Sequence, residues 1–160
     1  MKKILRYLLA TIGSFITGPV LGQQLAGAWK LIAADKVLPN GERTTDYGAG
    51  PHGIAIFTTN GHYTVEIFNN ERKAFASGDR EKGTPGEYRD AMLTMSCHFG
   101  TYEVDSVNKT IIFHIDKSSF PNGDGTTRKN NFTLSNDQLS WQLPPRRNGE
   151  IPVSVFTRIH

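Results

Sequence analysis

The segment from Asp46 to Phe68, DYGAGPHGIAIFTTNGHYTVEIF, most strongly constrains how this chain can fold. Residues 53–58 and 62–68 are rich in β-branched and aromatic side chains, and Asn60-Gly61 lies between them. An Asn-Gly pair tolerates positive φ at both central positions of a two-residue hairpin turn. The segment therefore predicts two antiparallel strands joined by a tight turn.

The two predicted strands differ in how they distribute apolar side chains. In the second, Tyr63, Val65 and Ile67 share one face, and the residues between them are polar. In the first, residues 54–57 (IAIF) place apolar side chains on both faces. A strand of that kind needs cover on both sides, and a closed barrel with a filled or ligand-holding interior supplies it.

Residues 1–22 have the architecture of a secretory signal peptide. Three basic residues precede an apolar stretch from Tyr7 to Ile16, and small or apolar residues stand before Gly22. The alternative is an uncleaved anchor, but Gly and Pro interrupt an apolar run that is shorter than the ~20 residues needed to span a bilayer. We therefore predict cleavage after Gly22, a mature domain over residues 23–160, export to the periplasm or the medium, and no stable membrane insertion after cleavage.

The charge balance changes when the signal is removed. The chain has 18 Lys and Arg against 15 Asp and Glu, and the signal contains three of the basic residues and no acidic one. The mature chain is therefore neutral and has no overall field to attract nucleic acid, so no nucleic-acid partner is expected. Arg146-Arg147 is the nearest approach to a basic run and is interpreted as part of a solvated loop.

The mature chain is long enough for one domain with its own core, and it contains no linker or repeat that would divide it. Cys97 is the single cysteine, so it cannot form an internal disulfide. A packing role is favoured for this thiol over a nucleophilic one. The sequence leaves the oligomeric state open.

Further strands are predicted on both sides of the hairpin. A first strand is expected near Ala28–Lys36, and later ones are bounded by turns at SVNK and SNDQ. The expected later strands are Gly100–Asp105, Thr110–Asp116, Arg128–Leu134, Gln138–Leu143 and Val153–Ile159. Together these segments predict an all-β fold, a single antiparallel up-and-down barrel of about eight strands.

One helix is predicted within this series, over TPGEYRDAMLTMS. Thr84 and Glu87 have the spacing of a capping box, Pro85 suits the first helical position, and apolar residues recur at helical spacing. The helix is expected to lie across one end of the barrel or to pack on its wall.

The order of several motifs resembles a known family. Gly27-Ala28-Trp29 and Arg158 are similar to the Gly-x-Trp and terminal Arg of lipocalins, and this resemblance implies that the arginine packs over Trp29 and closes the barrel floor. The segments LAGAWKL, YGAGPHGIAIFTTNGHYTV, FGTYEVD, FHIDKSSFPNGDGTTR and FTR resemble the bacterial and fungal lipocalin-like domain family of calycin-type barrels. Thr45-Asp46-Tyr47 also mimics a lipocalin motif, but it stands too early in the chain and is interpreted as coincidence.

The residues indicate neither a metal site nor a bound cofactor. The five histidines contain no pair at metal-ligand spacing, and no Cys-x-x-Cys, Gly-rich phosphate loop or nucleophile elbow occurs.

Four polar residues on predicted strands are the candidate ligand-binding residues: Tyr63, Tyr102, His114 and Arg128. For His114 the sequence leaves two orientations open, toward water or toward a cavity.

The family resemblance implies a pocket and leaves the activity open, since one scaffold hosts many functions. The favoured function is an exported protein that binds a small hydrophobic or amphipathic molecule without turnover. The alternative is a cofactor-free isomerase, cyclase or lyase in which a His or Tyr acts as acid or base. A third, weaker possibility is an interaction or inhibitor module with a filled interior.

Overall fold

The computed structural model describes residues 24–160, so the predicted signal peptide lies outside the described residues. Nine strands make up the sheet: β1 (Gly27–Val37), β2 (Arg43–Thr45), β3 (His52–Phe57), β4 (His62–Phe68), β5 (Met95–Asp105), β6 (Thr110–Ser118), β7 (Thr127–Ser135), β8 (Gln138–Gln142) and β9 (Ile151–Arg158). Within this part of the chain, no helix has the length and apolar character needed to cross a bilayer.

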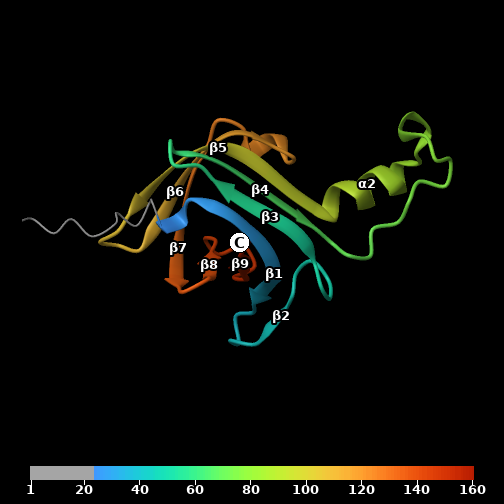
Figure 1. Ribbon diagram of the computed structural model, residues 1–160. Helices are drawn as coiled ribbons and strands as arrows, with labels where there is room; N and C mark the ends of the chain where they lie inside the picture. The colour runs from blue at the N-terminus through green and yellow to red at the C-terminus, as the bar shows by residue number, and fades with distance from the viewer. Residues whose placement is uncertain (1–23) are drawn as a thin grey trace, which may run out of the picture.

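Eight of these strands form a closed antiparallel barrel. Each pairs with its neighbour in the order β1-β3-β4-β5-β6-β7-β8-β9, and β1 also pairs with β9. The short β2 pairs only with the end of β1, where Asp35 to Val37 face Thr45 to Arg43. The predicted up-and-down barrel of about eight strands is confirmed (Figure 1).

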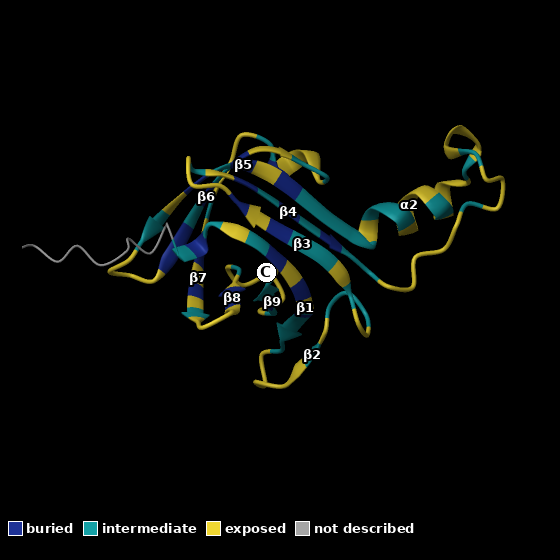
Figure 2. Cartoon of the chain, viewed as in Figure 1, coloured by how far each residue is buried: buried dark blue, intermediate teal, exposed yellow. Residues whose placement is uncertain are grey.

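Strand alternation determines which side chains fill the interior. On β4, Tyr63, Val65 and Ile67 are buried, and the residues between them are not. On β3, Ala55 and Phe57 point inward, whereas Ile56 on the other face is exposed. The outer face of β3 therefore lacks the cover that its apolar composition suggested (Figure 2).

An aromatic layer packs inside the barrel. Neighbouring rings in it have centroids 4.4 to 6.4 Å apart, in stacked, tilted and edge-to-face arrangements. Its members are Phe57, Tyr63, Tyr102, Phe113, Trp141 and Phe156. Aromatic pairs with this spacing add to the stability gained from burying their area. The layer leaves little free volume in the part of the barrel that it occupies.

The barrel floor lies at the start of β1. The Arg158 guanidinium carbon is 4.0 Å from the centre of the Trp29 ring, and the indole Nε1 donates to the Leu25 carbonyl at 2.8 Å. Arg158 also donates to the carbonyls of Ala26 (3.0 Å) and Gln24 (2.5 Å). These hydrogen bonds tie the segment before β1 across this end, so the barrel can open only at the other end.

The helix α2 (Pro85–Leu93) begins with the predicted capping box between Thr84 and Glu87. It does not cover the barrel as expected: it lies at the end of the long connection between β4 and β5, which extends away from the barrel (Figure 1). No helix residue is buried: Tyr88 packs edge-on against Phe75 of the connecting segment, and Leu93 is exposed. The helix therefore leaves the open end of the barrel uncovered.

Candidate ligand-binding cavity

Polar side chains enter the barrel interior mainly from β5 and β7. On β7, Arg128, Asn130 and Phe132 are less exposed than the residues between them, so this alternate set faces inward. The register pairs Phe113 with Arg128 across the inner face of β6 and β7. On β5, His98 is likewise buried among inward-facing residues. The sheet thus gathers a histidine, an arginine and an asparagine in one region of the interior.

A cavity of about 60 Å³ lies in this region, between the aromatic layer and the open end. Its polar lining includes Tyr47, His98, Arg128 and Asn130, and its apolar lining includes Val65, Ile67, Trp141 and Leu143. A water molecule needs roughly 10–15 Å³ on this measure, so the cavity holds a few waters or one small polar group. The interior therefore does not enclose a large apolar molecule in this conformation.

Larger hollows lie outside the barrel. One of about 340 Å³ is lined by residues of β7, β8 and β9, and another of about 360 Å³ lies beside α2. Both are open surface grooves. The interior cavity is the better candidate site because buried polar groups converge on it, and small-molecule sites combine apolar walls with a few placed polar groups.

His98 and Tyr63 form a buried pair beside the cavity. The Tyr63 hydroxyl lies 2.9 Å from His98 Nδ1, and His98 is only 9% exposed. Burial, and then the nearby positive charge of Arg128, lower the pKa of His98 to about 4. Burial also raises the pKa of Tyr63 well above its ordinary value. Both groups are therefore neutral at pH 7 and can offer a ligand hydrogen bonds but no charge.

Arg128 is a half-buried cation on the inner face of β7. Burial lowers its pKa, and the neighbouring Tyr63 and Tyr47 oppose that effect. An arginine side chain titrates so far above neutrality that it keeps its charge at pH 7. Among residues 24–160, the guanidinium forms no ion pair.

Asn130 carries an unsatisfied hydrogen-bond acceptor. Its side chain is 2% exposed, and its Oδ1 atom has no hydrogen-bond partner among the described residues. A buried polar atom without a partner costs about 1–3 kcal/mol, so such atoms are rare in folded proteins. A water or a ligand in the cavity would supply the missing donor.

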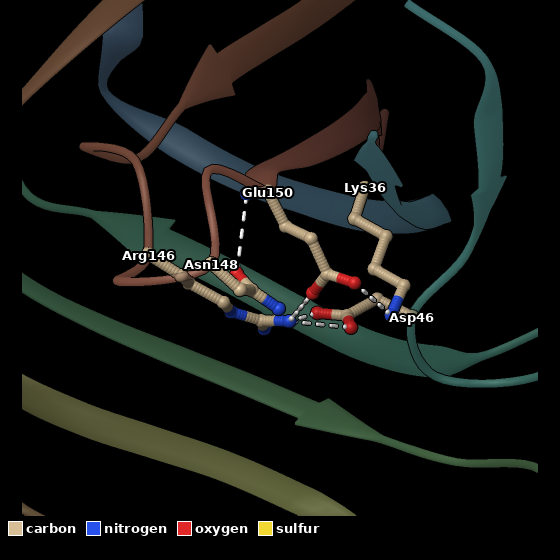
Figure 3. Close-up of polar contacts among 5 residues, drawn as sticks. All are labelled: Lys36, Asp46, Arg146, Asn148 and Glu150. Atoms are coloured by element: carbon tan, nitrogen blue, oxygen red, sulfur yellow. Dashed lines mark hydrogen bonds and ion pairs between the residues drawn. The ribbon is translucent and has the colours of Figure 1, made fainter. Parts of the chain in front are cut away.

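Four charged residues form a network at the open end, which we call the mouth network: Lys36, Asp46, Arg146 and Glu150 (Figure 3). Arg146 donates to both Asp46 carboxylate oxygens, at 2.9 and 2.5 Å, and to Glu150 at 3.2 Å. Lys36 donates to the other Glu150 oxygen at 2.8 Å. Asp46 and Arg146 also line the cavity, so the network ties the connection after β2 to the connection before β9 across the entrance.

The four predicted ligand-binding residues do not lie together. Arg128 lines the cavity. Tyr63 does not line it, but its hydroxyl lies within hydrogen-bond distance of His98, which does. Tyr102 instead packs in the aromatic layer, where its hydroxyl donates to the Thr58 carbonyl at 3.0 Å.

His114 lies on the outer face of β6, the outward one of the two orientations that the sequence left open, and it does not line the interior cavity. Its side chain is 41% exposed, and its ring nitrogens lie 3.4 Å from Glu103 Oε1 and 3.2 Å from Thr127 Oγ1. The physical reason is alternation: Phe113 and Ile115 fill the interior, so the residue between them points outward.

Several cavity residues were missed in the sequence. His98 and Asn130 could have been found by alternation, because they stand two residues from Gly100 and Arg128 on inward faces. Asp46 and Arg146 are 100 residues apart, and no local pattern links them. The sequence pattern indicates a solvated loop for Arg146 and a coincidental motif for Asp46-Tyr47, so it points to neither as a cavity residue.

A closed eight-stranded antiparallel barrel with a tethered floor and an inner cavity is a ligand-binding barrel architecture. Residues 26–153 match the family described as the lipocalin-like domain, and the chain belongs to that family.

Two solved structures are similar to the chain. A lipocalin-like protein from Bacteroides uniformis is 13% identical, with a TM-score of 0.44 over 84% of this chain and 98% of that one. A protein from Bacteroides eggerthii, described as uncharacterized, is 14% identical, with a TM-score of 0.42 over 84% of this chain and 99% of that one. No curated protein matches the chain.

Proposed function

We propose that this protein binds one small amphipathic molecule, with its polar end in the interior cavity beside Arg128 and Asn130. The unsatisfied Asn130 Oδ1 carries the proposal, because it is a buried acceptor on the wall of a cavity. Eight-stranded barrels of this class are wide enough inside to hold one small ligand.

The cavity volume limits how the ligand is held. About 60 Å³ accommodates a polar head group and no more. The apolar remainder then has to extend out of the cavity toward the open end, where the mouth network lies. A longer ligand therefore requires the Asp46–Arg146 contact to move.

A second candidate function, a cofactor-free isomerase or cyclase, is favoured by the hydrogen-bonded Tyr63–His98 pair beside the cavity. The same pair argues against efficient proton transfer. A histidine with a pKa of about 4 is a weak base at neutral pH, and a tyrosine with a raised pKa is a weak acid. Binding without turnover is thus the better-supported function.

Native mass spectrometry of freshly purified protein tests the binding proposal. We expect an added mass, released by solvent extraction, on the wild-type protein. Ala34→Leu should remove it, because Ala34 lines the cavity and a larger side chain fills it. Ala33→Leu is the matched control, since Ala33 is the adjacent residue and does not line the cavity. Identical spectra for the wild type and Ala34→Leu would contradict the proposal.

We further propose that the protein is exported and that residues 1–22 are removed. The basic start, the apolar stretch and the small residues before Gly22 support this proposal. N-terminal sequencing of protein from the periplasm or medium should begin at Gln23. Intact Met1 on protein held in the membrane fraction would contradict it.

A further inference from the structure

We propose that the molecule in the cavity is a carboxylate with an adjacent hydrogen-bond donor, as in a 2-hydroxy acid, and that its carboxylate pairs with Arg128. This inference rests on the proposed function and names the chemical class of the ligand. It follows from two unsatisfied groups on one strand face: a cation without an anion, and an acceptor without a donor.

Two carboxylates, Asp35 and Asp46, line the same cavity as Arg128, but the titratable groups that act on the Arg128 guanidinium carry no negative charge at pH 7. The titratable groups that act on its guanidinium are Tyr63 and Tyr47, and burial raises the pKa of both hydroxyls, so both are neutral. His98, which feels the Arg128 charge, is neutral as well. A cation placed among neutral groups in a protein interior is costly unless an anion joins it.

The acids that line the cavity or belong to the mouth network are already paired with other cations. Three carboxylates lie toward the open end. Asp35 accepts from Arg43 at 2.7 Å, Asp46 accepts from Arg146, and Glu150 accepts from Lys36 and Arg146. Within residues 24–160 every cation of the mouth network thus has its carboxylate, and Arg128 has none. An incoming carboxylate would pair with Arg128 without displacing an existing ion pair, and Arg is well suited to this because its planar fork matches carboxylate geometry.

Asn130 offers the ligand a second polar contact, a hydrogen-bond acceptor. It follows Arg128 by two residues on the same inward face of β7, and both side chains line the cavity. Its free Oδ1 accepts a hydrogen bond, which a carboxylate oxygen cannot donate. A hydroxyl on the carbon next to the carboxylate would satisfy it, and a head group of this size suits the cavity volume.

Three probes of equal chain length separate these contributions: 2-hydroxyhexanoate, hexanoate and 1,2-hexanediol. In calorimetric titrations of the full mature chain at pH 7.5, we expect 2-hydroxyhexanoate to bind most tightly. The diol lacks the charge and should bind about 10- to 100-fold more weakly, which is the range for a charge-assisted hydrogen bond. Hexanoate lacks the donor and should bind about tenfold more weakly.

Variants assign the two contacts. Arg128→Gln should abolish the preference for 2-hydroxyhexanoate over the diol without lowering the melting temperature, because it removes an unpartnered charge. Lys129→Gln is the matched control on the exposed face of the same strand and should leave all three affinities unchanged. Asn130→Asp places a carboxylate beside Arg128 and should block both acids while sparing the diol, so a second variant tests the proposal if Arg128→Gln fails to fold.

The possible outcomes distinguish this inference from the proposed function. Equal affinity for the diol and the hydroxy acid, lost in Ala34→Leu, would overturn the carboxylate assignment and leave ligand binding in the cavity intact. No saturable binding of any probe would also overturn the assignment, whereas the native mass spectra would still decide whether the cavity holds a molecule. If Arg128→Gln still binds 2-hydroxyhexanoate more tightly than the diol, a group other than Arg128 binds the carboxylate, and the assignment is overturned.

Discussion

The buried His98 predicts a loss of stability in mildly acidic solution. Its pKa is about 4 in the folded protein and 6.5 in an ordinary environment. Because the folded-state pKa is depressed, the unfolded chain binds the proton first, and the contribution to stability present above pH 6.5 is lost as the pH falls toward 4. This shift predicts that the free energy of unfolding decreases by about 2 kcal/mol between pH 7.5 and pH 5, and by about 3 kcal/mol in full.

Urea denaturation at several pH values between 7.5 and 5 measures this decrease. His98→Gln is the control, because it keeps a polar side chain beside Tyr63 and removes the titration. Carboxylates with lowered pKa, such as Glu87 and Glu150, titrate in the unfolded chain near 4.5, so their contribution is lost mainly below this window. If the wild type and His98→Gln lose stability in parallel, His98 is not a neutral buried group and the description of the cavity is wrong.

Three further predictions concern the floor, the mouth and the outer face. Trp29→Ala should lower the free energy of unfolding by about 3–5 kcal/mol in urea denaturation, because the indole is fully buried beneath Arg158; a loss under 1 kcal/mol would contradict its role in the floor. Asp46→Asn should speed both association and release of 2-hydroxyhexanoate in stopped-flow fluorescence, since it weakens the contact with Arg146; unchanged rates would mean that the ligand enters elsewhere. His114→Ala should leave the calorimetric affinity for the same probe unchanged, because the side chain faces outward; a tenfold loss would return His114 to the site.

Local patterns predicted the parts of the fold that depend on neighbours in sequence. The hairpin of β3 and β4, the inward set on β4 and the capping box of α2 follow from turn chemistry, alternation and helix capping. The turn itself differs from the prediction: it lies over residues 59–61, where Gly61 has positive φ and Asn60 does not. The position of α2 relative to the barrel could not be predicted, because the helix has few apolar residues and its position depends on which segment they pack against. Those contacts lie within its own connecting segment.

The site was less predictable than the fold, for two physical reasons. Alternation places His114 on the face of β6 opposite Phe113 and Ile115, but it does not decide which of the two faces lines the interior. The mouth network joins Asp46 to Arg146 across 100 residues, and only barrel closure brings them together. Arg128 could be predicted as a polar candidate on a strand, whereas its lack of an anionic partner is visible only in three dimensions.

A crystal structure of the mature protein with its co-purified molecule, or with 2-hydroxyhexanoate, tests the central claim most directly. The account predicts density in the interior cavity, with a carboxylate about 2.8 Å from the Arg128 guanidinium and a donor within hydrogen-bond distance of Asn130 Oδ1. Density confined to the grooves outside the barrel, over β7 to β9 or beside α2, with an empty or water-filled cavity, would contradict it.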